Sequence, residues 1–135
     1  MGPLLALRKA LYSTFAGDAA LIGVLGGVKI YADVPAATLP PYITFGLARV
    51  TRWTGGSSSG HAHLVTLDVW SLQKGDSEIL AIAERLAQII AATVWRLDGY
   101  RVLQCVVQMM TCHAPRSDGW RQVSLELSAY TEPVN

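Results

Sequence analysis

Two long segments in which apolar and polar residues alternate constrain the fold more than any other feature of this chain. Residues 42–53 and 61–72 are rich in β-branched and aromatic residues, which favour strands. In the second segment Val65, Leu67 and Val69 share one face, because successive side chains of a strand point to opposite faces. The residues between the segments, TGGSSSG at positions 54–60, predict a long flexible loop. Together they predict a long antiparallel hairpin with an overlong tip.

A second hairpin is predicted near the C-terminal end. Residues 101–112 alternate and are rich in β-formers, and a turn is expected at residues 117–119. Residues 123–129 alternate between apolar and polar side chains, which is the pattern of a half-buried antiparallel strand.

Three segments have helical spacing, and they span residues 3–16, 19–25 and 77–93. The first begins with Pro3, which suits a first helical turn, and Asp18 is placed to cap the second. The third has a continuous apolar stripe between Ile79 and Ile90.

The remaining segments are short. A short strand is expected at residues 28–31, a proline-rich irregular link at 33–41 and an extended segment at 95–97. Strands that come in pairs with few helices predict the α+β class: an antiparallel sheet built from two long hairpins plus a short strand, with two main helices packed on one face. A length of 135 residues predicts one domain across residues 1–135.

The charge of the chain is low. Charged residues make up 16% of it, against about 25% in a typical soluble domain. With 51% hydrophobic residues and a net charge of +1, a disordered chain and a polybasic nucleic-acid arm are excluded. No apolar run reaches the length of about 18 residues that spans a membrane, so we expect no membrane association. Either neutral polar residues coat the surface, or other subunits cover part of it.

The two cysteines are expected to be free. Cys105 and Cys112 lie on one predicted strand, roughly 23 Å apart at 3.3 Å per residue, which is too far for a disulfide. Free thiols suit a reducing compartment.

Several residues are of types that occur in metal or catalytic sites, but their spacing and surroundings do not support such a site. A zinc site could use His61, His63, Cys112 and His113, but their spacing matches no familiar ligand pattern, and polar strand ends are the favoured interpretation. The serines at 57–59 have neither a rigid support nor a base. Asp68 is interpreted as a solvated or interface-facing acid. We expect no catalytic, cofactor-binding or metal-binding residues and no enzyme activity.

The basic and aromatic residues of the first hairpin allow a second interpretation. Arg49, Arg52, Trp53 and His61 are of the types that line single-strand nucleic-acid surfaces, but the near-neutral chain has no basic cluster. Trp53, Trp70 and Trp120 lie at predicted strand faces and ends. There they either mark protein interfaces or cap the ends of the core.

The order of short motifs along the chain resembles one family. The motifs are LLALRKALY at 4–12, GDAAL at 17–21, KIY at 29–31, PPYITFG at 40–46, HLVTLDVWS at 63–71 and RSDG at 116–119. This layout resembles the tail-completion, or tail-terminator, proteins of long-tailed phages and gene transfer agents. The resemblance covers nearly the whole chain, and none of its motifs is catalytic.

The resemblance implies a structural assembly protein. It would form a homo-oligomeric ring, a hexamer, at the head-proximal end of a tail tube. That ring would end tube polymerisation and join the tail to the neck or head-completion (stopper) protein, and DNA would pass through its lumen without specific binding. The partners would be other copies of the chain and the major tail tube protein. The location would be the tail–neck junction of a virion or gene-transfer-agent particle, after assembly in the bacterial cytoplasm.

The predicted protein contacts combine the loop with the tryptophans. They are Trp53, Thr54, Gly55, Gly56, Ser57, Ser58, Ser59, Gly60, Trp70 and Trp120. We expect the loop at 54–60 to become ordered against the tail tube. Two alternatives remain: another neck or minor tail component, or a small non-enzymatic binding module.

Overall fold

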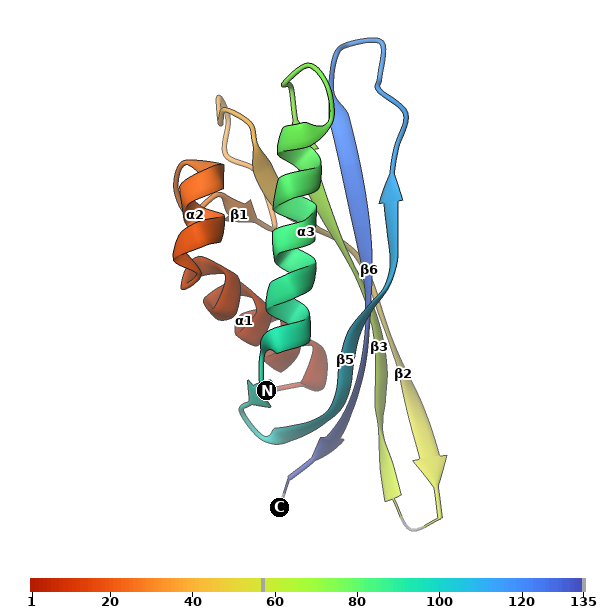
Figure 1. The fold of residues 1–135 in the computed structure, drawn as a ribbon. Helices are drawn as coiled ribbons and strands as arrows, with labels where there is room; N and C mark the ends of the chain where they lie inside the picture. Colours follow the sequence, from red (N-terminus) through yellow and green to blue (C-terminus); the bar gives the residue numbers. More distant parts are fainter. Residues whose placement is uncertain (57, 135) are drawn as a thin grey trace.

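A six-stranded sheet with helices on one face forms the fold (Figure 1). The computed structural model describes residues 1–56 and 58–134. The helices are α1 (Pro3–Ala16), α2 (Ala19–Leu25) and α3 (Ser77–Ala92). The strands are β1 (Ile30–Tyr31), β2 (Tyr42–Gly55), β3 (Ser58–Ser71), β4 (Arg96–Leu97), β5 (Tyr100–Cys112) and β6 (Arg121–Pro133). The predicted α+β class is confirmed.

The two predicted hairpins lie side by side in the sheet. The strand order is β1-β2-β3-β6-β5-β4, so the pairing of β3 with β6 joins the β2–β3 hairpin to the β5–β6 hairpin. This central pair is antiparallel and places Leu67 opposite Leu125. The short first strand covers less than the expected residues 28–31, and it pairs parallel to β2 through Ile30 and Ile43. The sheet is therefore antiparallel except at this edge.

The core lies between the helices and one face of the sheet. Figure 1 shows α1, α2 and α3 on the same side of the sheet. Leu7, Leu11 and Phe15 of α1 are fully buried, at the four-residue spacing that keeps side chains on one helix face. In β3 the buried residues are Val65, Leu67 and Val69, the alternate positions expected from the sequence. Within the described residues, no helix is long and apolar enough to cross a membrane.

A partly exposed ion pair links the N-terminal end of α2 to α3. Asp18 caps α2 by accepting a hydrogen bond of 2.9 Å from the amide of Leu21. The guanidinium of Arg85, on α3, donates to both Asp18 oxygens, at 2.6 Å and 3.0 Å. These bonds stabilise the carboxylate, so the pKa of Asp18 is lowered and that of Arg85 is raised. The helix ends at Gly26, whose φ of 78° is a conformation that glycine adopts without strain.

The prediction of a long flexible loop at 54–60 is wrong. Both strands continue through it, with Trp53 opposite Gly60, Thr54 opposite Ser59 and Gly55 opposite Ser58. Only Gly56 and Ser57 lie between the strands, and Ser57 is outside the described residues. Glycine and serine do not show the alternation of apolar and polar side chains that indicates a strand. Their backbone N–H and C=O groups nevertheless form the hydrogen bonds of a sheet as well as those of other residues. Gly56, with a φ of 59°, then supplies a positive dihedral of the kind that tight hairpin turns use.

Candidate interaction surface

One face of the sheet is left uncovered by the helices, and it carries several of the residues that the sequence suggested as candidates for contacts. Along β3 and β6 the side chains between the core positions point to this open face, which is defined by Leu64, Thr66, Asp68 and Trp70 of β3 with Gln122, Ser124, Glu126 and Ser128 of β6. All of these residues are partly exposed. These side chains are therefore held at defined positions by the pairing of β3 with β6.

Aromatic rings gather at one end of the open face. This aromatic cluster consists of Tyr31, Tyr42, Trp70 and Trp120. The ring of Trp120 lies 5.9 Å from that of Tyr42 and 6.3 Å from that of Trp70, between centroids. The indole nitrogen of Trp70 donates a 2.9 Å hydrogen bond to Thr44 Oγ1, which fixes the orientation of the ring. Two of the three predicted contact tryptophans thus form one partly exposed cluster.

The third tryptophan lies at the opposite end of the sheet, near the tip of the β2–β3 hairpin. The indole of Trp53 packs against Gly60, where an added Cβ would lie 2.6 Å from the ring. The indole Nε1 of Trp53 is buried and has no hydrogen-bond partner among the described residues. Beyond it, the residues that end the two strands are exposed: Thr54, Gly55, Ser58 and Ser59. The structure therefore divides the predicted contacts between two distant ends.

A polar network on the open face was not predicted. Asp68 accepts hydrogen bonds from Ser124 Oγ at 2.6 Å and from Gln122 Nε2 at 2.9 Å. His113 Nε2 lies 2.8 Å from the same Ser124 oxygen. The alternation places Asp68 and Ser124 on polar faces, but only the pairing of β3 with β6 puts them opposite each other.

The network contains Ser, His and Asp without the order that catalysis needs. In an activated serine the hydroxyl proton is directed to histidine, and the carboxylate orients that histidine. Here the Ser124 hydroxyl donates its hydrogen bond to the Asp68 carboxylate, so the hydroxyl proton points to the acid and not to His113. The arrangement fixes neighbouring strands and does not activate a nucleophile.

The four residues weighed as zinc ligands form two pairs at different ends of β6. His61 and His63 lie on β3 opposite the end of β6 that holds Thr131 and Ala129, whereas His113 contacts Ser124. His63 is buried, and its Nε2 lies 2.9 Å from Thr131 Oγ1. Burial lowers the pKa of His63, with a smaller contribution from His61. Within residues 1–56 and 58–134, no group of three or more His, Cys, Asp or Glu residues is placed to hold a metal ion.

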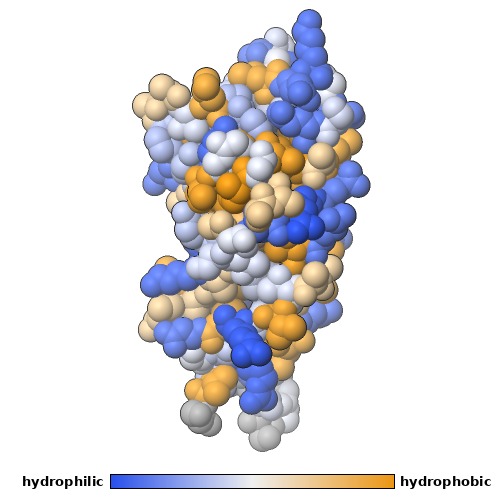
Figure 2. Space-filling view, turned by 60° about the vertical axis from the view of Figure 1, so that its left-hand side comes forward, coloured by the Kyte–Doolittle hydropathy of each residue, from blue (hydrophilic) through white to orange (hydrophobic). Residues whose placement is uncertain are grey.

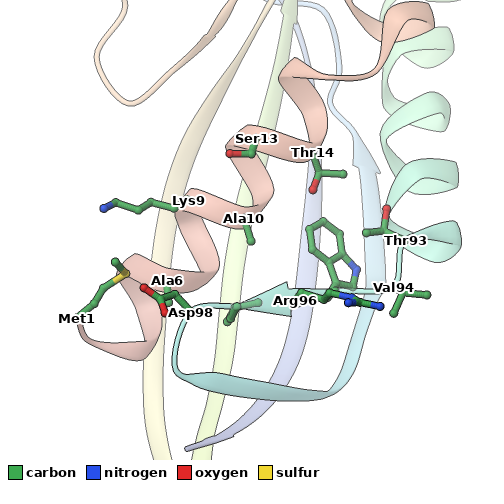
Figure 3. A pocket seen from close by; sticks show the side chains of 12 residues that line it. Met1, Ala6, Lys9, Ala10, Ser13, Thr14, Thr93, Val94, Arg96 and Asp98 are labelled. Carbon is green, nitrogen blue, oxygen red and sulfur yellow. The ribbon is translucent and has the colours of Figure 1, made fainter. Parts of the chain in front are cut away.

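A pocket opens where α1 meets the segment after α3 (Figure 3). Ser13 and Thr14 line it from α1, and Thr93 and Asp98 from the other side. Figure 3 shows Lys9 extending away from Thr93. Thr93 Oγ1 donates to the carbonyl of Ile89 at 2.6 Å, which satisfies the end of α3. These contacts are those of a helix terminus.

Apolar and polar side chains are interspersed on the side of the molecule that carries α1 and α2 (Figure 2). There Leu5 and Tyr12 are exposed, and the guanidinium carbon of Arg8 lies 4.7 Å from the ring centroid of Phe45. The cation covers part of an aromatic surface that would otherwise face solvent.

Comparison with known families assigns the chain. A family model described as Tail completion protein gp17 matches residues 9–132. The chain belongs to the tail completion protein gp17 family. The match spans β1 to β6 and includes Trp53, Trp70 and Trp120, and the resemblance seen in the sequence motifs is confirmed.

A solved structure shares the fold of this tail completion protein. It is a chain from the virion of a native gene transfer agent (GTA) particle, with a TM-score of 0.86 and 21% sequence identity. The structural similarity covers 96% of this chain and 96% of the other, so the two folds correspond over almost their full lengths. No match was found among curated proteins.

Proposed function

We propose that this tail completion protein is a non-enzymatic structural component of a phage-like or gene-transfer-agent particle. In this proposal it forms a hexameric ring at the head-proximal end of the tail tube, ends tube polymerisation and joins the tail to the neck protein. The observation that carries the proposal is the family match over residues 9–132. The virion origin of the structural neighbour supports the location.

The charge of the protein supports a role as a conduit. The net charge is +1, and the central strands place the acids Asp68 and Glu126 on the open face. DNA-binding surfaces concentrate cations along the phosphate backbone. A ring built from such subunits would let DNA pass through its lumen without holding it.

The two ends of the molecule support contacts with two partners. The β2–β3 hairpin projects past the helices in Figure 1, and its tip residues Thr54 and Ser59 are exposed. We assign this tip, with Trp53 and Gly60 at its base, to the tail tube protein. The aromatic cluster with Trp70 and Trp120 lies at the opposite end, and we assign it to the neck protein, since partly exposed aromatics are frequent interface anchors.

Light scattering after size-exclusion chromatography tests the ring. The expected mass is six copies, either for the chain alone or after addition of the tail tube protein. A chain that stays monomeric at every concentration and ignores tube protein contradicts the proposal. In particles that lack the protein, tail tubes of undefined length are the expected result.

A charge variant tests the tip assignment. Ser58→Asp with Ser59→Asp places two acids on the β3 side of the tip, away from the open β2 edge, and tube docking is expected to be lost while the ring persists. Ser117→Asp, in the turn of the other hairpin, is the matched control and should leave docking unchanged. Docking by the tip variant at the control level would overturn the assignment and leave the ring proposal standing.

A further inference from the structure

The outer edge of β5 is open along most of its length. The two-residue strand β4 pairs only with Tyr100 and Arg101, so residues 102–112 have no partner on that side among the described residues. These residues read VLQCVVQMMTC and contain neither a charge nor a proline. An edge strand presents unpaired N–H and C=O groups that can template pairing with another chain.

Natural edge strands are usually protected, and β5 is protected only weakly. Charged side chains and proline are the common devices, together with bulges. The pairing of β5 with β6 is irregular near Leu103 and Gln108, and residues 102–112 carry neither of the other two devices. Four apolar side chains on this strand, Leu103, Val106, Met109 and Met110, are between 38% and 54% exposed. Such a strand is suited to being covered in an assembly.

The opposite edge of the sheet is open as well. Here β1 pairs only with Ile43 and Thr44 of β2, which leaves residues 45–55 without an outer partner in the described chain. Leu47 on this edge is 61% exposed. The open runs 45–55 and 102–112 have the same length, and they lie at the two ends of one sheet.

We propose that the β5 edge of one copy pairs with the β2 edge of a second copy, so that the sheet continues from subunit to subunit. The inference rests on the proposed ring and names the contact that closes it. Each step from β2 to β3, β6 and β5 is antiparallel, so β2 and β5 run in opposite directions. An added β2 therefore continues the antiparallel order.

Charge and symmetry favour this pairing over the two alternatives. A β2–β2 contact brings Arg49 and Arg52 of one copy towards the same residues of the other, and like charges across paired strands are unfavourable. A β5–β5 contact is two-fold and leaves both β2 edges open. A head-to-tail β5–β2 contact closes by rotation into a ring with no open edge.

Cysteine cross-linking tests the proposal. Val106, paired with Ser128, and Thr51, paired with Ala62, both point to the open face. The background is Cys112→Ser, which removes the exposed thiol; burial raises the pKa of Cys105 to about 12, so that thiol stays unreactive. Paired strands bring Cα atoms within disulfide range. Several registers between the two strands are tested, so Val106→Cys is combined in turn with Arg49→Cys, Thr51→Cys and Trp53→Cys.

The chain length of the oxidised products decides between the pairings. Chains that carry both cysteines are expected to give a ladder that ends in a covalent ring. A mixture of Val106→Cys chains with chains that carry only the β2 cysteine should stop at dimers. Val106→Cys alone should stay monomeric under denaturing electrophoresis. Dimers from Val106→Cys alone would show β5–β5 pairing and overturn the proposal.

A charge variant separates this inference from the proposed function. Val106→Lys is expected to abolish the oligomer measured by light scattering, with and without tube protein, while its circular dichroism stays that of the parent. Val94→Lys, at a residue 78% exposed and outside any strand, is the control and should assemble. Hexamers of Val106→Lys, or hexamers that no cysteine pair cross-links, would overturn the edge pairing and leave the ring. A parent chain that never assembles would overturn both.

Discussion

The two faces of the central sheet are built from alternate residues of the same strands and are stabilised differently. On β3, Val65, Leu67 and Val69 face the helices and are fully buried. Their neighbours Thr66 and Asp68 face the open side and stay partly exposed. Burial of apolar surface dominates the first face, whereas single hydrogen bonds and ring contacts order the second. The helix-covered face therefore contributes most of the stability of the fold, and the open face contributes less.

Substitution of Leu67 tests the covered face and should have the largest effect. Leu67→Ala leaves a cavity in the core, and we expect a loss of about 2–5 kcal/mol in the free energy of unfolding. The adjacent Thr66→Ala, on the open face, should change it by no more than about 0.5 kcal/mol. Urea denaturation measures both. Equal losses at the two positions would show that the faces do not differ.

Gly60 lies opposite Trp53 at the base of the hairpin tip and is closely surrounded. In Gly60→Ala the new methyl group meets the Trp53 ring and the backbone oxygen of Thr131, and we expect a cost of about 1–3 kcal/mol. Gly23→Ala in α2 meets no atom within 4 Å, so the same change there should stabilise the protein by about 0.5–1 kcal/mol. Thermal unfolding of both variants gives the sign. A stabilised Gly60→Ala variant would contradict the close packing.

Ser124 tests the polar network of the open face. Ser124→Ala removes a donor to Asp68 and the contact with His113, with an expected loss of about 1 kcal/mol. Ser128→Ala lies on the same face of β6 and is the matched control, with no loss expected. Guanidinium denaturation at neutral pH distinguishes them. If both variants unfold at the same midpoint, the network adds nothing to stability.

The buried imidazole of His63 makes the covered face sensitive to mild acid. Because burial lowers the pKa of folded His63, the unfolded chain takes up the proton first, near the ordinary histidine pKa of about 6.5. The contribution of His63 is complete above that pH and is lost as the pH falls through it. His63→Gln should flatten the decline between about pH 7.5 and 5.5. Urea midpoints across this range measure it, and an unchanged slope would remove His63 as the cause.

Local patterns predicted the elements of this fold, and they did not predict how the elements meet. The alternation in 61–72 and 123–129 placed the core faces correctly, because burial of one face fixes which residues point inward. Residues 54–60 were misassigned, since small residues have no pattern that separates a loop from a ladder. The meeting of Trp70 with Trp120, and of Asp68 with Ser124, depends on the β3–β6 register. That register is set by contacts between distant segments, which no local pattern encodes.

The family, by contrast, was accessible from short motifs. PPYITFG at 40–46 includes the start of β2, HLVTLDVWS at 63–71 makes up the later part of β3, and both lie within the matched residues 9–132. They combine β-forming residues with Gly46, where an added Cβ would lie 2.7 Å from an oxygen of Asp68. At Gly46 the missing side chain therefore leaves room for the Asp68 carboxylate.

The pairing of β3 with β6 has a consequence for how the chain folds during synthesis. Leu67 and Leu125 are neighbours in the sheet but lie far apart in the sequence, with α3 and the whole of β5 between them. Closing so long a loop is slow, and contacts between distant segments delay folding. Until the ribosome has released β6, the inner edge of β3 is exposed together with its apolar side chains. We therefore expect loss of the last strand to leave the β2–β3 hairpin prone to aggregation and the rest of the sheet without its centre.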